Sequence, residues 1–381
     1  MKYIILIGDG MADRPIKKLG GKTPLEVAKT PNMDFIARNG VCGMVSTIPK
    51  GVQPGSDVAN LSIFGYDPKV SYPGRGPLEA YSRGIKLGPN DVAFRCNLVR
   101  IENGKMKDYS AGHITTAEAK KVIKLMDREL GNKKIRFFPG VSYRHILIIN
   151  GGPAMVKCTP PHDISGRPIN KYLPKGPGAD ALNILMGDSF EILSAKGGKA
   201  NMIWLWGQGK TPKMKKFPLK GSVITAVDLI KGIGKAIGLK AINVPGATGY
   251  LDTNYAGKAK YALASLNKND FVFVHVESPD EAGHEGNIKH KIKAIEDFDK
   301  YVVGTILKGL RKYKDHKIMV LPDHATPISI KTHSSEPVPF AIYSSKKKIR
   351  GAKAYDEKNI SRSKLRIDQG HKLMKFFMRS A

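Results

Sequence analysis

Three stretches of the sequence share one pattern, in which a short apolar run leads directly into a loop that carries acids or histidines. The runs and the residues that follow them are 3–7 with Asp9, 271–276 with Asp280 and His284, and 317–321 with Asp323 and His324. In α/β proteins, ligands collect at the carboxyl edge of a parallel sheet. The pattern therefore predicts such a sheet, with candidate metal ligands along that edge.

The length of the chain predicts more than one domain. Its 381 residues, 41% of them hydrophobic, exceed the size at which a single core usually stops growing. Between the ligand stretches the pattern changes to Gly- and Pro-rich segments, strand-like runs, a hairpin signal at Asn103-Gly104 and one helix. We therefore expect a discontinuous α/β core, residues 1–67 and 171–381, with a mainly parallel sheet covered by helices. A smaller α+β module, residues 68–170, would be inserted into it.

Short apolar runs after residue 170 lack polar alternation, which is typical of strands covered on both faces. They lie at residues 200–206, 223–228, 271–276 and 317–321. We expect all four to belong to the sheet of the core.

Several classes of protein are not supported by the composition. No run of eighteen apolar residues is present, and the chain enters a strand after two residues, so neither a membrane span nor a signal peptide is expected. We expect a cytoplasmic protein. The three cysteines, Cys42, Cys96 and Cys158, are scattered, which disfavours a disulfide framework and a zinc knuckle.

The net charge of +30 raises the question of nucleic-acid binding. The lysines and arginines are spread along the chain, and no known docking element accompanies them. A solvated basic surface is the simpler interpretation, and specific nucleic-acid binding is not expected. A positive field would also attract a small anionic substrate. Homo-oligomerisation is left open.

Asp280 and His284 are four residues apart, so one helical turn would place both on the same face, where they could chelate a divalent ion. Asp323 and His324 are adjacent, which suits two neighbouring sites or one site in a bent loop. His333 follows in a polar loop that gives no packing reason for a histidine. Each residue alone is better explained by a surface or core role, but their shared placement after strands favours a two-metal site.

Ser56 begins a segment that reads as a buried helix, and a helix N-terminus attracts phosphate. Two interpretations stay open here: the serine caps the helix, or it is a nucleophile. A serine hydroxyl needs a base or a metal to become nucleophilic at neutral pH. No catalytic triad and no G-x-S-x-G motif is evident, so a metal would have to activate it.

The candidate ligands and the candidate nucleophile resemble, in their order and sequence context, the metal and nucleophile positions of the alkaline phosphatase superfamily. They are Asp9, Ser56, Asp280, His284, Asp323, His324 and His333. More closely, the chain resembles the archaeal-type phosphoglycerate mutases that work without a bisphosphoglycerate cofactor. The resemblance covers nearly the whole length. It runs through IGDGM at 7–11, GSDVAN at 55–60, GRGPLEA at 74–80, FRCNL at 94–98, HVESPDEAGH at 275–284 and DHATP at 323–327.

The resemblance implies a ligand set and a reaction. Two divalent ions would be bound, one by Asp280, His284 and His333, the other by Asp9, Asp323, His324 and the Ser56 oxygen. The Ser56 oxygen would attack the phosphoryl group of 3-phosphoglycerate to form a phosphoserine, and glycerate would turn and take the group back on its 2-hydroxyl. Carboxylate and imidazole ligands favour Mn²⁺, with Zn²⁺, Co²⁺ and Mg²⁺ as alternatives.

Such a reaction must retain glycerate and exclude water, which gives the inserted module the role of a substrate-binding lid. Cationic side chains would bind the carboxylate and the phosphate. The candidates are Arg75, Arg95, His113 and Arg144 in the insert and Lys258 in the core. Each of them could equally face solvent in so basic a chain.

Two rival functions remain at this level. A phosphatase or a phosphonate-processing enzyme could use the same scaffold, because one metal core supports several chemistries. A nucleic-acid-binding or scaffold protein could keep the fold without catalysis, but the intact set of acids and histidines disfavours it.

Overall fold

The structure is a computed structural model that describes residues 1–347 and 349–379, so residues 348, 380 and 381 of the predicted core lie outside the described part. The chain divides into two compact units. One unit is formed by Met1–Tyr72 together with Met214–Ala381, and the other by Pro73–Lys213. The insert therefore ends at Lys213 and not at the expected residue 170.

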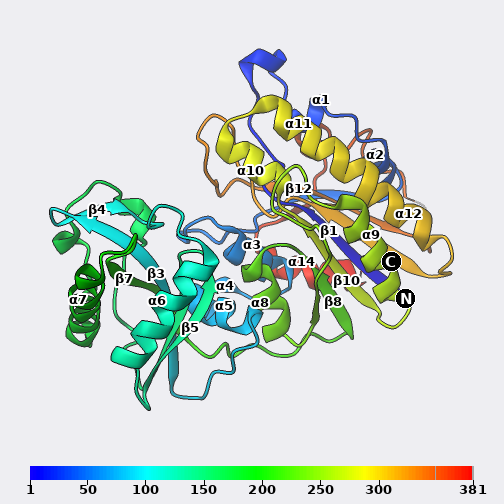
Figure 1. Cartoon of the computed structure of the whole chain (residues 1–381). Coiled ribbons are helices and arrows are strands. Elements are labelled where there is room, and N and C mark those ends of the chain that lie inside the picture. Colours follow the sequence, from blue (N-terminus) through cyan, green and yellow to red (C-terminus); the bar gives the residue numbers. More distant parts are fainter. Residues whose placement is uncertain (348, 380–381) are drawn as a thin grey trace. The chain divides into compact units, whose positions relative to one another are not determined.

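The core unit is built on an eight-stranded sheet with the order β13-β2-β12-β11-β1-β10-β8-β9 (Figure 1). All neighbours from β11 to β9 pair in parallel, whereas β12 runs antiparallel to β11 and β2. The predicted mainly parallel sheet is confirmed. The strands are β1 (Lys2–Gly8), β2 (Val41–Val45), β8 (Gly221–Ile224), β9 (Lys240–Ile242), β10 (Phe271–Val276), β11 (His316–Leu321), β12 (Val338–Ser344) and β13 (Arg366–Ile367).

Helices cover both faces of this sheet. They are η1 (Lys17–Leu19), α1 (Pro24–Val27), α2 (Pro31–Arg38), α3 (Ser56–Ile63), α4 (Pro68–Ser71), α8 (Asp228–Ala236), α9 (Tyr255–Leu266), α10 (Ser278–Glu285), α11 (Ile288–Asp297), the π-helical η4 (Phe298–Val303), α12 (Gly304–Leu310), α13 (Glu357–Ile360), η5 (Gly370–Lys372) and α14 (Leu373–Arg379). No helix in the described ranges combines the length and the apolar character needed to cross a bilayer.

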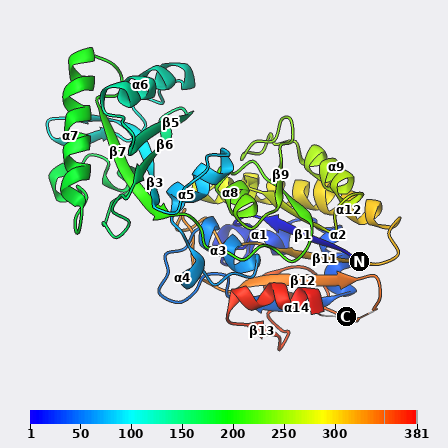
Figure 2. The ribbon, with the colours of Figure 1, turned by 90° about the horizontal axis from the view of Figure 1, so that it is seen from below.

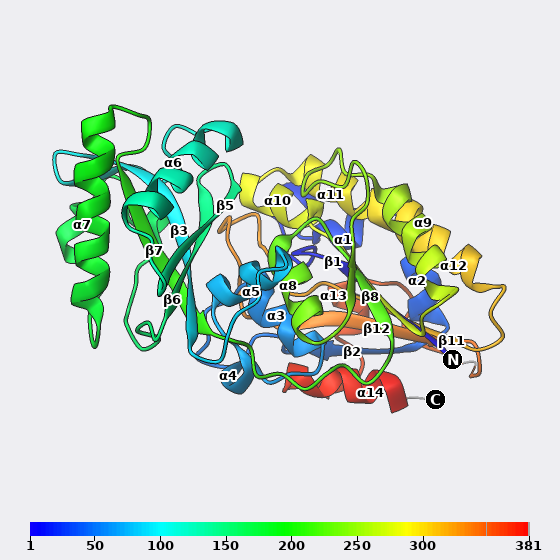
Figure 3. The same ribbon diagram turned by 60° about the horizontal axis from the view of Figure 1, so that its bottom comes forward.

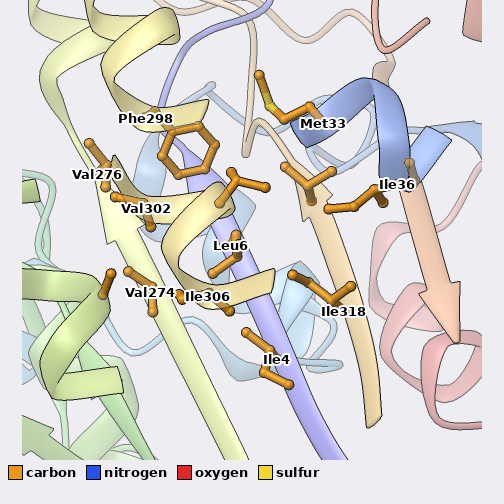
Figure 4. Packing of buried hydrophobic residues seen from close by; sticks show 14 of the residues in the cluster. Ile4, Leu6, Met33, Ile36, Val274, Val276, Phe298, Val302, Ile306 and Ile318 are labelled. Atoms are coloured by element: carbon orange, nitrogen blue, oxygen red, sulfur yellow. The ribbon is translucent and has the colours of Figure 1, made fainter. Parts of the chain in front are cut away.

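Alternate residues of the central strands point to opposite faces, as the two-residue period of a strand requires. Ile4 and Leu6 of β1 join Val274 of β10 in a cluster with α2, η4 and α12 (Figure 4). On the other face, Phe273 stacks on Phe64, the residue that follows α3, with ring centroids 4.3 Å apart. The red helix α14 lies along β12 on that face, as Figures 2 and 3 show. Burial on both faces explains why these strands are uniformly apolar.

The insert contains a five-stranded antiparallel sheet, as its hairpin signal predicts. Its elements are α5 (Arg75–Ser82), β3 (Asp91–Glu102), β4 (Lys105–Asp108), α6 (Thr116–Glu129), β5 (Ile135–Val141), β6 (Arg144–Asn150), η2 (Pro161–Ile164), η3 (Ile169–Lys171), α7 (Ala179–Lys196) and β7 (Met202–Lys210). One face packs on α6 and α7, whereas α5 covers the other. The predicted α/β class with an inserted α+β module is confirmed.

The run at residues 200–206 was expected in the core sheet, and this expectation is wrong. It forms β7, which pairs antiparallel with β3 along most of the length of β3. Helix α7 packs against β7 through the buried side chains of Leu182 and Met186. A strand buried on both faces reads as a continuous apolar run in either sheet, so composition alone did not reveal its partner.

Candidate metal centre and active site

The three ligand loops follow β11, β1 and β10, which are neighbours in the core sheet. Asp9 comes directly after β1, and its backbone N–H donates to Val276 O at the end of β10. Asp280 lies in the first turn of α10, and Asp323 comes just after β11. Because parallel strands end at the same edge, the sheet brings together carboxylates that are 43 to 314 residues apart in sequence.

Asp280, His284 and His333 form one candidate ligand group, with ligand atoms within 4.8 Å of one another. His284 Nε2 lies 3.1 Å from Asp280 Oδ2 and 3.0 Å from His333 Nε2. His333 Nε2 lies 3.5 Å from Asp280 Oδ1. One carboxylate and two imidazole nitrogens are a donor set that transition-metal ions accept.

A backbone carbonyl orients the His284 ring. His284 Nδ1 lies 3.0 Å from Lys331 O, and Lys331 has a positive φ of 53°, which turns this loop towards α10. Donation from Nδ1–H leaves the Nε2 lone pair free for an ion, as in many metal sites. Hydrogen bonding to Asp280 outweighs burial and raises the pKa of His284 to about 9. A divalent ion would compete with a proton for Nε2.

Asp9, Asp323, His324 and Ser56 are the second predicted ligand group, and within it the ligand atoms of Asp9 and His324 lie within 4.8 Å of each other and of an atom of Asp280. His324 Nε2 lies 3.4 Å from Asp9 Oδ1, 3.8 Å from Asp323 Oδ2 and 3.2 Å from Ser56 Oγ. Both acids and the histidine are buried, and Asp9 Oδ1 makes no hydrogen bond within the described residues. Burial, followed by repulsion from Asp323 and Asp280, raises the pKa of Asp9 well above its ordinary value. A buried carboxylate oxygen that makes no hydrogen bond among the described residues, beside two further acids, fits a bound cation.

The position of Ser56 separates the two interpretations of this serine. Gly55 is the N-cap of α3, and Ser56 is the first helical residue. Its Oγ lies beside His324, in the second ligand group. The geometry therefore does not support a capping role for Ser56.

Asn60 connects α3, the helix that begins at Ser56, to Asp323 of the second ligand group. Its Nδ2 donates to Ser56 O at 2.8 Å and to Asp323 Oδ2 at 2.7 Å. Asn60 was not among the site residues predicted from the sequence. An asparagine one helical turn after the serine, between the apolar residues Ala59 and Leu61, was the signal that could have found it.

His275 is a second buried residue that the sequence analysis did not assign. Its Nε2 lies 3.2 Å from Asp9 Oδ2 and 3.8 Å from Asp323 Oδ2, and its Nδ1 lies 3.4 Å from Thr225 Oγ1. Asp9, His275 and Asp323 thus form a further group that could hold an ion. A histidine inside the apolar run of β10 was the available signal, because a buried polar side chain needs partners.

Gly10 allows the two ligand groups to approach each other. Its φ is +59°, and a Cβ atom there would lie 2.5 Å from both Asp280 Oδ1 and Thr326 Oγ1. Its backbone N–H donates to Asp323 Oδ1 at 3.1 Å. Only glycine supplies this conformation and this space.

Gly10→Ala is therefore expected to weaken metal binding and to destabilise the protein by more than the roughly 1–2 kcal/mol of the left-handed conformation. Mn²⁺ titration and thermal unfolding measure the two effects. Gly20→Ala is the matched control, because Gly20 has a similar φ of +66° and open space around its Cβ position. Equal Mn²⁺ affinity in the two variants would contradict the prediction.

In the insert, two of the predicted substrate-binding residues, Arg75 and Arg95, lie beside Trp206. The Arg95 guanidinium lies 4.3 Å from the Trp206 ring, and that of Arg75 lies 5.7 Å from it. Arg95 also pairs with Glu79 at 3.1 Å. Burial lowers the pKa of Arg95, and repulsion from Arg75 and Arg144 adds to this effect. Clustered guanidinium groups favour an anion.

His113 and His162 differ in their relation to this cluster. His113 is exposed in a loop held by Asp108, and within the described residues no contact joins it to the arginines. His162, which the sequence analysis left unassigned, packs edge-on against Trp206 with ring centroids 5.4 Å apart. Burial lowers the pKa of His162, against attraction from Asp163. The structure thus adds His162 to the surroundings of the arginine cluster.

Lys258 belongs to the core unit and lies beside the ligand strands. Its Nζ is buried and donates to His275 O at 3.2 Å. Burial lowers the pKa of Lys258 to about 8, against attraction from Glu277 and Asp9. Glu277 has its pKa raised to about 7, chiefly by burial.

The fold and the site define a class: α/β proteins with clustered carboxylate and imidazole groups beside a helix-borne serine, at the carboxyl edge of a mainly parallel sheet. The family model of 2,3-bisphosphoglycerate-independent phosphoglycerate mutase matches residues 37–197. The chain belongs to this family, as relatives that match it over nearly their whole length show.

Two relatives and two solved structures illustrate the match. The mutase of Methanosarcina barkeri is 54% identical over 96% of both chains, and that of Methanosarcina mazei is 50% identical over the whole of both. A solved Pyrococcus horikoshii protein has a TM-score of 0.81 and 30% identity, covering 99% of this chain and 96% of that one. The cofactor-independent phosphoglycerate mutase of Thermoplasma acidophilum has a TM-score of 0.67 and 26% identity, covering 100% and 99%. The predicted family is confirmed.

Proposed function

We propose that this chain interconverts 3-phosphoglycerate and 2-phosphoglycerate through a phosphoserine on Ser56, with two divalent ions as cofactors. The observation that carries the proposal is the position of Ser56 Oγ, 3.2 Å from His324 Nε2 and inside a buried group of acids. A scaffold protein would gain nothing from burying these carboxylates together, because uncompensated buried charge is costly.

The two ligand groups are the proposed holders of the ions. Asp280, His284 and His333 would bind one, and Asp9, Asp323, His324 and Ser56 the other. His275 would support Asp9 and Asp323 from the β10 side. When bound, the ions would neutralise charge on the phosphoryl group and lower the pKa of the serine hydroxyl. Mn²⁺ is the ion that we expect, with Zn²⁺, Co²⁺ and Mg²⁺ as alternatives.

The proposed transfer has two balanced halves. In the first, Ser56 Oγ loses its proton and forms a bond to phosphorus, while the bond from phosphorus to the 3-oxygen breaks and that oxygen is protonated. In the second, the 2-hydroxyl of the same glycerate loses its proton and takes the phosphoryl group, and Ser56 Oγ is protonated again. No water and no redox partner is consumed.

The insert has a proposed role in gripping the substrate. Arg75 and Arg95 lie beside Trp206, and Arg144 is close enough to Arg95 to lower its pKa, which supports binding of a small anion by these three arginines. His113 and Lys258 are weaker candidates, because one is exposed apart from the arginines and the other donates to a backbone carbonyl. The insert comprises residues 73–213 in the structure. We propose that it acts as a lid that closes during the reaction.

A phosphatase or another phosphotransferase is the rival function on this scaffold, and the names of the full-length relatives favour the mutase. The test is to incubate the purified protein with 3-phosphoglycerate and Mn²⁺ and to follow 2-phosphoglycerate and free phosphate in the same samples. We expect 2-phosphoglycerate to accumulate to equilibrium with little phosphate. Release of phosphate without 2-phosphoglycerate would reject the mutase.

Arg144→Ala is expected to raise KM for 3-phosphoglycerate by about tenfold or more, because a charge-assisted contact to an anion contributes about 1.5–3 kcal/mol. Arg144 is exposed, so its loss should leave the unfolding temperature unchanged. Arg128→Ala is the control, because Arg128 is an exposed residue on α6 that pairs only with the neighbouring Glu129 among the described residues. An unchanged KM in Arg144→Ala would remove it from the substrate site.

A further inference from the structure

Thr326 lies between the two ligand groups. It is fully buried, three residues after Asp323 in the loop that follows β11. Its Oγ1 donates a hydrogen bond to Asp280 Oδ1, in the first group, and lies 3.2 Å from His324 Nδ1, in the second. One hydroxyl therefore contacts a ligand candidate of each proposed ion.

The chemistry of the three groups fixes the direction of these hydrogen bonds. An ionised carboxylate only accepts, so the single hydroxyl proton of Thr326 is directed to Asp280. The Thr326 oxygen then accepts from His324, which requires the proton of the imidazole to be on Nδ1. His324 Nε2 is left with its lone pair, on the side of the ring that faces Ser56 Oγ and Asp9 Oδ1. This is the tautomer that binds a metal ion through Nε2.

The backbone of Thr326 is held from two sides. Its N–H donates to Ala12 O at 3.3 Å, and its carbonyl accepts from Lys291 Nζ at 2.7 Å. Lys291 is fully buried, pairs with Asp13 at 2.8 Å and also donates to Ala12 O. The loops after β1 and β11 are thus joined to α11 by one buried lysine.

The side chain of Thr326 is enclosed as well. A Cβ atom on Gly10 would lie 2.5 Å from Thr326 Oγ1, and one on Gly283 would lie 2.9 Å from its methyl carbon. The hydroxyl and the methyl group therefore have different, tightly packed surroundings. The β-branched side chain is stiff at χ1, so this packing directs the hydroxyl to Asp280 and His324.

We propose that Thr326 is a positioning residue that links the two ion sites and holds His324 in the Nδ1–H tautomer. Its hydroxyl contacts Asp280 and His324, and within the described residues no hydrogen bond joins it to Ser56 Oγ, the proposed reacting oxygen. This inference rests on the proposed function, because it assumes that Asp280 and His324 bind the ions. Loss of the Thr326 hydroxyl would weaken metal binding, and turnover would fall as a consequence.

The test compares Thr326→Val with Thr326→Ser. Valine keeps the shape but leaves Asp280 and His324 without their shared partner, whereas serine keeps the hydroxyl and loses only the methyl group. Metal-free full-length proteins are titrated with Mn²⁺ by calorimetry. We expect Thr326→Val to bind Mn²⁺ about 10–100-fold more weakly than the wild type, and Thr326→Ser to recover most of the difference. The absorption spectrum of Co²⁺-loaded protein should change in the valine variant and not in the serine variant.

Ser222→Ala is the matched control. Ser222 is buried in β8, its Oγ lies 2.6 Å from Ser265 Oγ, and it pairs with Val272 near the start of β10, away from the ligand edge. It should lose stability without losing Mn²⁺ affinity. If Thr326→Val does not fold, Thr326→Ala against Thr326→Ser makes the same comparison.

Three outcomes of these titrations separate the inference from the proposed function. A wild-type protein that binds Mn²⁺ and a Thr326→Val variant that binds it equally well would overturn the inference alone. Equal losses in Thr326→Ser and Thr326→Val would also overturn it, because the hydroxyl would then have no special part. A wild-type chain that binds no Mn²⁺ would overturn the proposed metal site and, with it, the inference.

Discussion

Ser56→Ala is expected to lower mutase turnover by about 10⁴-fold or more, because it removes the proposed nucleophile. The fold should persist, since α3 is capped at Gly55 and does not use the Ser56 hydroxyl as its cap. Metal should also stay bound, because Asp9, Asp323 and His324 keep their ligand atoms. Turnover of 3-phosphoglycerate and the Mn²⁺ content of the same preparation are the measurements.

Ser62→Ala is a suitable control for this experiment. Ser62 is buried in the same helix, and its Oγ makes no hydrogen bond within the described part of the chain. It should keep nearly full activity. Rapid quenching of the wild type with substrate should yield a peptide phosphorylated at Ser56, and this peptide should be absent from Ser56→Ala. Substantial mutase activity in Ser56→Ala would rule out the phosphoserine route.

His284→Ala is expected to remove one Mn²⁺ per chain and nearly all activity. Its Nε2 lies within 3.1 Å of both Asp280 Oδ2 and His333 Nε2, so the first ligand group would keep one carboxylate and one imidazole. Loss of a direct ligand should weaken Mn²⁺ binding at this site by more than the 10–100-fold typical of outer contacts, so more than about 100-fold. Elemental analysis after dialysis, together with Mn²⁺ titration, checks the stoichiometry.

His290→Ala serves as the control for His284→Ala. His290 is exposed at the start of α11, where its Nδ1 lies 2.8 Å from Glu285 Oε2. It should change neither the metal content nor the activity. If His284→Ala retained the metal content of the wild type, His284 would have to leave the proposed ligand set. Ser56→Ala and His284→Ala also differ from each other, because only the second should change the number of ions.

The ligand loops could be predicted because each follows an apolar strand that is buried on both faces. In β1, β10 and β11 the sequence pattern and the sheet agree, and the strand ends bring Asp9, Asp280 and Asp323 together. The four-residue spacing of Asp280 and His284 predicted a helical turn, and both residues lie in α10. These signals are local in the sequence. The parallel pairing of the strands is what places the residues at one edge of the sheet.

The boundary of the insert could not be predicted in the same way. The apolar run that forms β7 has the composition of a core strand, and only its pairing with β3 assigns it to the insert. His275 and Thr326 were overlooked for a related reason. A histidine within a strand and a threonine within a loop are common, and their importance comes from partners such as Asp9 and Asp280 that lie far away in sequence.

The central position of β1 has a consequence for the order in which the protein is assembled. Tyr3 pairs with Phe271 on one side and with Lys317 on the other, so the strand made first must wait for segments made much later. Residues 73–213 are contiguous and carry their own hydrophobic core, so they can fold while the ribosome is still translating the rest. The proposed ion-binding centre needs side chains from Asp9 to His333, so it can form only after most of the chain has been made, and a nascent chain should acquire metal late in its folding.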